Sequence, residues 1–239
     1  MTDTIVVIGA TGGIGAALAR LLATRGVRLH LIARDSTALA PLAAALQASH
    51  AIADCTDDAA LTAAVTQAGP RIAGLAYCVG SILLKPLKRA SVADFADTFA
   101  LNVIGAARAV AAAEPGLRAS GGSVVLFSSI AARTGFSNHT VIGSAKAAVE
   151  GLTIALAAEL APVRVNCIAP SLTRTAMAAG LTGNEAMAKA IAAQHPIPRL
   201  GEASDAAALA GFLLSPDSSW ITGQVIGVDG GRSTLRTRA

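Results

Sequence analysis

The sequence has few aromatic residues, few charges and few cysteines. Aromatic residues make up 3% of the 239 positions, with one tyrosine and one tryptophan, and charged residues make up 14%. A nucleic-acid-binding surface combines a clustered basic face with aromatic side chains, and the sequence shows neither. The net charge of +4, part of which lies in the C-terminal GRSTLRTRA, equally suits a small phosphorylated ligand. We therefore expect a small-molecule partner and no nucleic acid.

The cysteines Cys55, Cys78 and Cys167 are isolated from one another. They form no CxxC pair and no metal-ligand spacing, which predicts free thiols in a reducing compartment and no metal site. The N-terminal MTDTIVVIGATGG lacks the basic segment of a signal peptide. No run reaches the roughly 18 uninterrupted apolar residues of a membrane span. These absences predict a cytoplasmic protein without a membrane partner.

Hydrophobic residues, by contrast, make up 53% of the chain, and alanine is abundant. Short runs rich in β-branched residues alternate with longer helical patterns, which is typical of a parallel sheet covered by helices on both faces. We therefore predict a single α/β domain over 1–239, a doubly wound fold with a seven-stranded parallel sheet. Strands are predicted at 4–9, 27–33, 51–54, 72–80, 121–129, 163–170 and 223–231, and helices at 13–26, 36–49, 57–69, 91–113 and from 138 onward.

Residues 171–201 are the least regular part of the chain. A loop of this length in a compact domain is often a lid or a substrate-binding element. Its second part, MAAGLTGNEAMAKAIAAQHPIPRLG, predicts a small helical lid. Met177 and Met187 offer adaptable apolar contacts there, although methionines more often serve simply as packing residues.

A glycine-rich turn follows the first strand. Gly9, Gly13 and Gly15 stand in GATGGIG, where the strand ends and a helix begins. Glycines let the backbone approach a pyrophosphate, and a helix N-terminus adds N–H groups and positive potential. The alternative is a tight turn without a ligand, but the strand–turn–helix context favours a dinucleotide site.

This glycine spacing and several later motifs resemble the short-chain dehydrogenase/reductase family. The later motifs are DCT (54–56), NVIG (102–105), the serines at 128–129, RVNCIAPSLTRTAM (164–177) and ITGQVIGVDGG (221–231), so the resemblance covers nearly the whole chain. It implies a Rossmann-like fold, a nicotinamide cofactor and a homodimer or homotetramer. The implied cofactor contacts are Gly9, Thr11, Gly12, Gly13, Ile14, Gly15, Arg34, Asp54, Cys55, Gly80, Lys146, Pro170, Thr173 and Thr175.

The end of the second strand bears on the choice of cofactor. An acid there accepts a hydrogen bond from the ribose 2′-OH of NAD, whereas an arginine suits the 2′-phosphate of NADP. The family's NAD-dependent members carry an aspartate where this chain has Ala33, and Arg34 follows it. Asp35 comes next and complicates this interpretation, and the alternative is that Arg34 and Asp35 form a solvated turn pair. We predict NADP(H), with NAD(H) less favoured.

The resemblance also implies a catalytic set of asparagine, serine, tyrosine and lysine. In the family the tyrosine moves a proton, the lysine binds the nicotinamide ribose, the serine hydrogen-bonds the substrate oxygen, and the asparagine supports the proton relay. Asn102, Ser129 and Lys146 occupy three of these positions. The tyrosine position, four residues before the lysine, is Ile142, which has no polar side-chain atom.

Four side chains are candidates for the missing proton donor. We prefer His139, three residues before the tyrosine position, because an unperturbed imidazole titrates near pH 6.5. The alternative for this histidine is a loop cap or a backbone contact. Ser129 is a weak acid unless activated, and Ser144 lies only two residues from Lys146, so a helix would turn it away. Tyr77, the single tyrosine, is expected nearer the cofactor's ribose than its reacting ring.

Two more positions depart from the family pattern: YCVG at 77–80 replaces Asn-Asn-Ala-Gly, and Ser171 replaces a glycine. Losing a positioned acid–base group costs about 10²–10⁴-fold, whereas proximity and orientation act separately. The sequence therefore favours an atypical NADP(H)-dependent oxidoreductase acting on a carbonyl, alcohol or activated double bond. The alternatives are a non-catalytic NADP(H)-binding protein and an interaction module that has lost its ligand. Substrate contacts are expected in the loops 81–90, 130–140 and 172–200, which carry no recognisable signature.

Overall fold

The computed structural model describes residues 3–236, so the ends of the predicted domain, 1–2 and 237–239, lie outside the described residues. Its main feature is a seven-stranded sheet in the order β3-β2-β1-β4-β5-β6-β9, and every neighbouring pair is parallel. The predicted single-domain α/β fold is confirmed. The strands are β1 (Thr4–Ile8), β2 (Arg28–Ala33), β3 (Ser49–Ile52), β4 (Ile72–Tyr77), β5 (Ser123–Phe127), β6 (Arg164–Pro170) and β9 (Val225–Val228).

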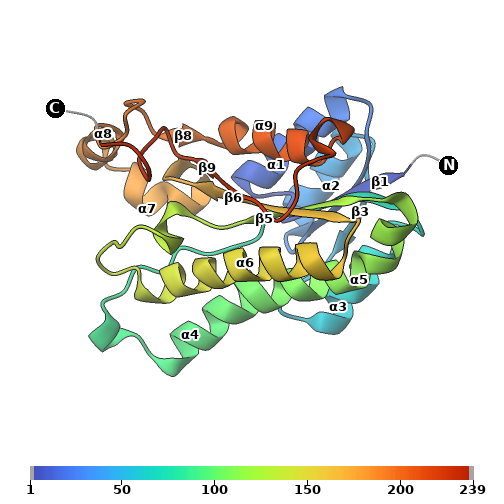
Figure 1. Cartoon of the computed structure of the whole chain (residues 1–239), viewed down its shortest axis with the longest axis horizontal. Helices are drawn as coiled ribbons and strands as arrows, with labels where there is room; N and C mark the ends of the chain where they lie inside the picture. The colour runs from blue at the N-terminus through green and yellow to red at the C-terminus, as the bar shows by residue number, and fades with distance from the viewer. Residues whose placement is uncertain (1–2, 237–239) are drawn as a thin grey trace.

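Helices cover both faces of this sheet (Figure 1). One layer contains α1 (Gly13–Thr24), α2 (Ser36–Ala45) and α9 (Ala203–Leu213). The other contains α3 (Asp58–Thr66), α4 (Val92–Phe99), α5 (Gly105–Ser120) and α6 (Thr140–Glu159). Each layer buries its own hydrophobic cluster against the sheet, and this burial of apolar side chains on both faces explains why the strands read as continuous apolar runs.

The strand order reverses direction between β1 and β4. In open α/β sheets, a ligand-binding crevice forms at such a reversal, outside the carboxyl ends of the strands. The glycine turn follows β1, and the segment containing Gly80 follows β4. The fold therefore brings two of the predicted cofactor segments to one crevice.

The helix predicted over 91–113 differs from the structure in two ways. It is interrupted by a π-helical segment, Ala100–Ile104, and it continues through Pro115 to Ser120. A proline inside a helix costs about 3 kcal/mol, so the sequence pattern predicts that the helix ends before Pro115. Here Ala113 and Leu117 are fully buried against the sheet, so tertiary packing outweighs the local cost.

Helix α2 begins at Ser36, as predicted, and Asp35 is its N-cap. The Asp35 carboxylate accepts hydrogen bonds from the backbone N–H groups of Thr37 and Ala38 at 2.9 and 3.2 Å. Aspartate is among the best N-cap residues, and it satisfies N–H groups that a helix start leaves free. These bonds and the Thr37 hydroxyl, whose contribution is the largest, lower the pKa of Asp35.

Residues 171–201 contain the expected helical region. The short helices α7 (Ala179–Thr182) and α8 (Glu185–Ala192) lie between two short strands, β7 (Thr173–Arg174) and β8 (Gly201–Glu202). These strands pair with each other in parallel, and the backbone N–H of Gly201 donates to the Leu172 carbonyl at 3.0 Å. The two ends of the segment are therefore held side by side. The remaining short helical turns are Leu87–Arg89, Ile130–Ala132, Ala176–Ala178 and Pro216–Ser218.

Two helical stretches, Val92–Ser120 and Thr140–Glu159, are long and apolar enough by length and composition to cross a membrane. Both belong to the layer that covers one face of the sheet (Figure 1). Val110 and Val149, one from each stretch, are buried in the hydrophobic cluster of that face. Packing on the sheet therefore accounts for part of their apolar character.

Candidate functional site

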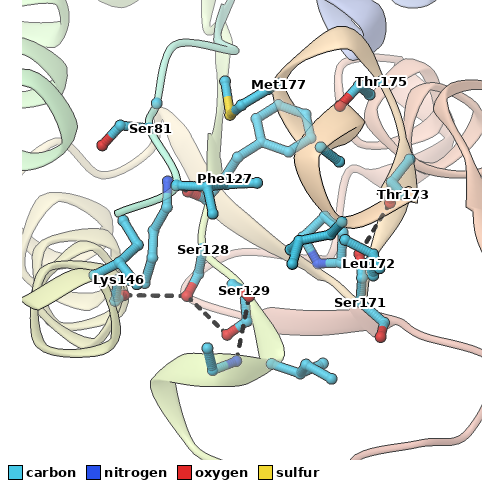
Figure 2. Close-up of a pocket in the computed structure, with 18 of the residues that line it drawn as sticks. Ser81, Phe127, Ser128, Ser129, Lys146, Ser171, Leu172, Thr173, Thr175 and Met177 are labelled. Carbon is cyan, nitrogen blue, oxygen red and sulfur yellow. Dashed lines mark hydrogen bonds between the residues drawn. The ribbon is translucent and has the colours of Figure 1, made fainter. Parts of the chain in front are cut away.

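A cavity of about 300 Å³ opens at the carboxyl ends of the strands. Its walls come from the segments after β4 and β5, from α6 and from the 171–201 segment, which follows β6. Figure 2 shows Ser128, Ser129 and Lys146 on the side formed by β5 and α6, and Ser171 and Leu172 on the side formed by the segment after β6. Of the residues predicted from sequence, this cavity brings together Ile14, Gly80, Ser129, His139, Lys146, Pro170, Thr173 and Thr175.

The glycine turn has the geometry of an anion cradle. Gly9 has a φ of +79°, in the left-handed region that favours glycine. A β-carbon on Gly15 would lie 2.2 Å from the Gly9 carbonyl oxygen, so only glycine fits where the helix packs on the turn. Helix α1 begins after Gly12 without a side-chain cap, and its first N–H groups are free to bind an anion. Thr11, Gly12 and Gly13 remain at least partly accessible. The residues present fit a dinucleotide pyrophosphate.

Arg34 and Asp54 lie together at the ends of β2 and β3, away from the cavity. The Arg34 Nη1 is 3.4 Å from an Asp54 oxygen, and both side chains are substantially exposed. Hydrogen bonds from Thr56 are the main cause of the lowered pKa of Asp54. The carboxylate of Asp35 is directed to the N-terminus of α2, and among residues 3–236 the ion-pair partner of Arg34 is Asp54. Cys55 is buried, and burial raises the pKa of its thiol to about 11.

Lys146 extends from α6 to the end of β5. Its Nζ donates a hydrogen bond to the Phe127 carbonyl at 2.9 Å. The side chain is almost fully buried, and this burial lowers the pKa of the amine to about 8. An ammonium has three N–H donors, so two remain for hydroxyl groups of a ligand. Desolvation makes this site receptive to hydrogen-bond acceptors.

Asn102 lies in the π-helical segment, a type of irregularity often found at functional sites. Its Nδ2 donates to the Thr98 carbonyl at 2.9 Å and to the Ser81 hydroxyl at 3.1 Å. Its Oδ1 is buried without a hydrogen-bond partner among residues 3–236. A β-carbon on Gly80 would lie 3.0 Å from this oxygen and 3.1 Å from the Lys146 Nζ. The glycine thus allows the amide and the amine to approach the same point.

The two serines after β5 have different surroundings. The Ser128 hydroxyl lies 3.0 Å from a carboxylate oxygen of Glu150 and 3.1 Å from the Lys146 carbonyl, both acceptors. The Ser129 hydroxyl accepts a hydrogen bond from the Ala131 N–H at 3.2 Å and keeps its own proton for another partner. Ser129 is therefore the serine that can donate to a substrate oxygen.

Ile142 and Lys146 are one helical turn apart on α6, and both line the cavity. Ile142 is buried, with 5% of its surface exposed. The position where the resemblance implies a tyrosine is thus part of the site, and an apolar side chain occupies it.

His139 is the last residue before α6 and lines the same cavity. Its Nδ1 is 2.8 Å from the Ser137 carbonyl, and its ring lies 5.3 Å from that of Phe136 between centroids. The backbone contact considered as an alternative is therefore present, but it engages only one ring nitrogen. Within residues 3–236, Nε2 has no hydrogen-bond partner.

Tyr77 and Ser144 point to other partners. The buried Tyr77 hydroxyl donates to the Leu101 carbonyl at 2.7 Å, which ties β4 to the π-helical segment. The Tyr77 side chain belongs to the hydrophobic core and does not line the cavity. Ser144 donates to the Val141 carbonyl at 2.9 Å, as expected for a side chain turned away from the site.

The structure adds site residues that sequence reasoning missed. Ser171 was noted only as a departure, and its hydroxyl is 2.8 Å from Nε2 of His195, a buried residue of the 171–201 segment. Ser171 lines both the main cavity and a second one of about 490 Å³, which His195 also lines. Arg232 and Phe136 line the main cavity as well. Nothing in the sequence marks these residues, because their neighbours in space are far away along the chain.

The model of the enoyl-(acyl carrier protein) reductase family matches residues 9–233. A tropinone reductase homologue of Arabidopsis thaliana is 33% identical over 240 residues, covering 95% of this chain and 91% of the relative. The mitochondrial dehydrogenase/reductase SDR family member 2 of Homo sapiens is 32% identical over 239 residues, covering 94% and 84%. A short-chain type dehydrogenase/reductase from Mycobacterium ulcerans superposes with a TM-score of 0.91 at 34% identity, covering 98% of this chain and 90% of the other. The motifs, the fold and these similarities together establish that the chain belongs to the short-chain dehydrogenase/reductase family of oxidoreductases.

Proposed function

We propose that the protein binds NADP(H) and transfers a hydride to or from a carbonyl, an alcohol or an activated double bond. We further propose that His139 replaces the tyrosine as proton donor. One observation carries this proposal: Ser129, His139 and Lys146 line one cavity, although an isoleucine stands at the tyrosine position. The family's shared oxidoreductase chemistry supports the reaction class.

The proposed choice of NADP(H) rests on Arg34. Its exposed guanidinium lies beside Asp54 at the end of β2, and it presents a planar set of donors that suits a phosphate. Asp35, the nearest acid in sequence, is occupied as a helix cap. The solved structure described as ElxO with NADP bound superposes with a TM-score of 0.89 at 25% identity, which makes NADP compatible with this fold.

The nicotinamide ring, when bound, supplies or accepts the hydride. Gly9, Gly13 and the start of α1 would hold the pyrophosphate, and Lys146 would donate to the nicotinamide ribose hydroxyls. Ser129 would orient the substrate oxygen through its free proton. Asn102, whose Oδ1 has no partner among the described residues, would accept a hydrogen bond from a water or from the lysine amine.

His139 has the features of a proton donor. Its Nδ1 faces the Ser137 carbonyl, an acceptor, so Nδ1 carries a proton. Nε2 is then the nitrogen left to exchange a proton with a substrate. In the direction of reduction, His139 would give a proton from Nε2 to the substrate oxygen, and the bound nicotinamide would supply the hydride to carbon.

The test of this proposal is turnover of NADPH with a panel of carbonyl and enone substrates. We expect slow but measurable turnover, which falls about 10²-fold or more in His139→Ala, as for loss of a general acid. Lys146→Ala should raise the KM for NADPH. Ser144→Ala serves as a control on the same helix, because its hydroxyl is turned away from the site. Equal turnover in His139→Ala and the parent protein refutes the assigned donor.

The buried Ile142 favours a second candidate, a non-catalytic NADP(H)-binding protein. This alternative predicts saturable binding of NADPH without turnover on any panel. The substitution Ile142→Tyr separates the two candidates, because the other family residues already line the cavity or border it. A gain of activity in Ile142→Tyr, starting from none in the parent, would establish the non-catalytic role and show that the rest of the site is competent.

We also propose that the protein assembles as a homodimer or homotetramer in the cytoplasm. The outer faces of α4, α5 and α6 carry exposed apolar side chains: Val92 is 87% exposed, Ile154 is 58% exposed, and Ile104, just before α5, is 57% exposed. Apolar faces of this kind are typical of a protein–protein contact. Light scattering after gel filtration should give a mass of two or four chains, and a monomer would refute the proposal.

A further inference from the structure

The substrate side of the cavity contains a cation that the proposed reaction does not use. Arg232 follows β9, is half-buried and lines the cavity. Its guanidinium carbon lies 4.9 Å from the centroid of the Phe136 ring. Partial burial lowers the pKa of this arginine, although a guanidinium keeps its charge under all ordinary conditions. The site therefore holds a permanent positive charge in partly desolvated surroundings.

This charge has no acidic partner within the described part of the chain. No ion pair of Arg232 occurs among residues 3–236, and no aspartate or glutamate lines the cavity. The nearby Asp229 is engaged by the N–H groups of Gly231 and Ser233 and by the Ser233 hydroxyl. The charge of Asp229 still acts on Arg232, but among residues 3–236 it forms no ion pair with the guanidinium and does not line the cavity. A cation in a cavity lined by no acid favours an anionic ligand.

The contacts of Arg232 also hold it in place. One nitrogen, Nη2, donates to the side-chain oxygen of Gln194, and the Phe136 ring covers one face of the guanidinium. A guanidinium packed on an aromatic ring keeps the donors along its edges, and these match the two oxygens of a carboxylate. The neighbouring lining is mostly apolar and includes Leu172, Met177 and Leu181.

We propose that Arg232 binds a carboxylate of the substrate, so that the substrate is a carbonyl compound with an apolar body and a carboxylate remote from the reacting carbon. This inference rests on the proposed function of the same cavity. It assigns the carbonyl end to Ser129 and the acidic end to Arg232, with the apolar residues between them.

The test compares 4-formylbenzoate with its methyl ester as substrates for NADPH-dependent reduction. The two probes share the aldehyde and the ring and differ in the negative charge. We expect kcat/KM to favour the acid by roughly tenfold or more, the range for a hydrogen bond to a charged group. Arg232→Gln should abolish this preference by lowering kcat/KM for the acid far more than for the ester, and Arg232→Lys should keep part of it. Arg236→Gln removes the same charge from an exposed neighbour and should match the parent protein.

Calorimetric titration of 4-formylbenzoate into the protein, with and without NADP⁺, gives a readout that does not depend on turnover. Weaker binding in Arg232→Gln but not in Arg236→Gln supports the carboxylate site, even if neither probe is reduced and the proposed function fails. Equal binding and an equal acid-to-ester ratio in Arg232→Gln and the parent overturn the inference, whether or not the protein is an enzyme.

Discussion

Gly80 lies close to both Asn102 and Lys146, which makes Gly80→Ala an informative substitution. A β-carbon here would lie 3.1 Å from the Lys146 Nζ and 3.0 Å from the Asn102 Oδ1. These separations are tighter than almost all real contacts of a β-carbon, so the amine and the amide must each move by a few tenths of an ångström. The backbone at Gly80 is outside the left-handed region, so alanine does not strain the fold itself.

The expected effect follows from the single hydrogen bond that holds the lysine. Its Nζ is anchored on the Phe127 carbonyl at 2.9 Å, and a hydrogen bond of this kind contributes about 1 kcal/mol net. Displacing the amine weakens this anchor and misdirects the donors proposed to bind the cofactor ribose. A loss of about 1.4 kcal/mol corresponds to a tenfold weaker Kd. We therefore expect NADPH binding to weaken about tenfold in Gly80→Ala, and turnover to fall at least as much.

Calorimetry with NADPH measures the first effect, and thermal unfolding checks that the fold is intact. Gly151→Ala is the matched control, because Gly151 lies on the exposed side of α6 with nothing within 4 Å of an added β-carbon. This control should bind NADPH normally and gain about 0.5–1 kcal/mol of stability from the higher helix propensity of alanine. Unchanged NADPH affinity in Gly80→Ala would show that the lysine amine does not hold the cofactor.

Three other predictions concern pH, cofactor choice and the 171–201 segment. Burial lowers the pKa of His30 below its ordinary 6.5, so the folded protein binds this proton less readily than the unfolded chain. Stability is then full above pH 6.5 and decreases as the pH falls below it; a melting temperature that stays constant from pH 7 to 5 would contradict this. Arg34→Leu should weaken NADPH binding about tenfold and leave NADH unchanged, because only NADPH carries the 2′-phosphate, and equal losses for both would refute the role. Ser171→Gly removes the partner of the buried His195 Nε2 and should cost about 1–3 kcal/mol in urea unfolding, with recovery in Ser171→Gly/His195→Val.

Local patterns in the sequence were sufficient to predict the fold and the start of the cofactor site. The apolar runs of β1 and β4–β6 and the glycine turn each lie within one short stretch of sequence. Hydrophobic periodicity and glycine spacing are therefore enough to predict them. The continuation of α5 through Pro115 could not be predicted, because it depends on burial against strands distant in sequence. The capping role of Asp35 carried a local signal, since an aspartate directly before a helical pattern is a preferred N-cap.

The candidate site was predictable only where a family motif marks a position. Asn102 and Lys146 were found in this way, whereas the π-helical segment around Asn102 has no sequence signal that we recognise. His195 lies 24 residues beyond Ser171, and Arg232 is farther along the chain still. Their roles depend on contacts with Ser171 and Phe136. Such contacts arise from chain folding, and no spacing rule anticipates them.

The pairing of β7 with β8 has a consequence for how specificity can diversify on this framework. Because Thr173 and Gly201 are neighbours in space, the residues between them form a long loop whose two ends are held together. Lengthening or exchanging this loop does not change the positions of β6 and α9. The residues beyond Thr175 that cover the cavity can therefore differ from one substrate to another without displacing the glycine turn or the strands of the main sheet.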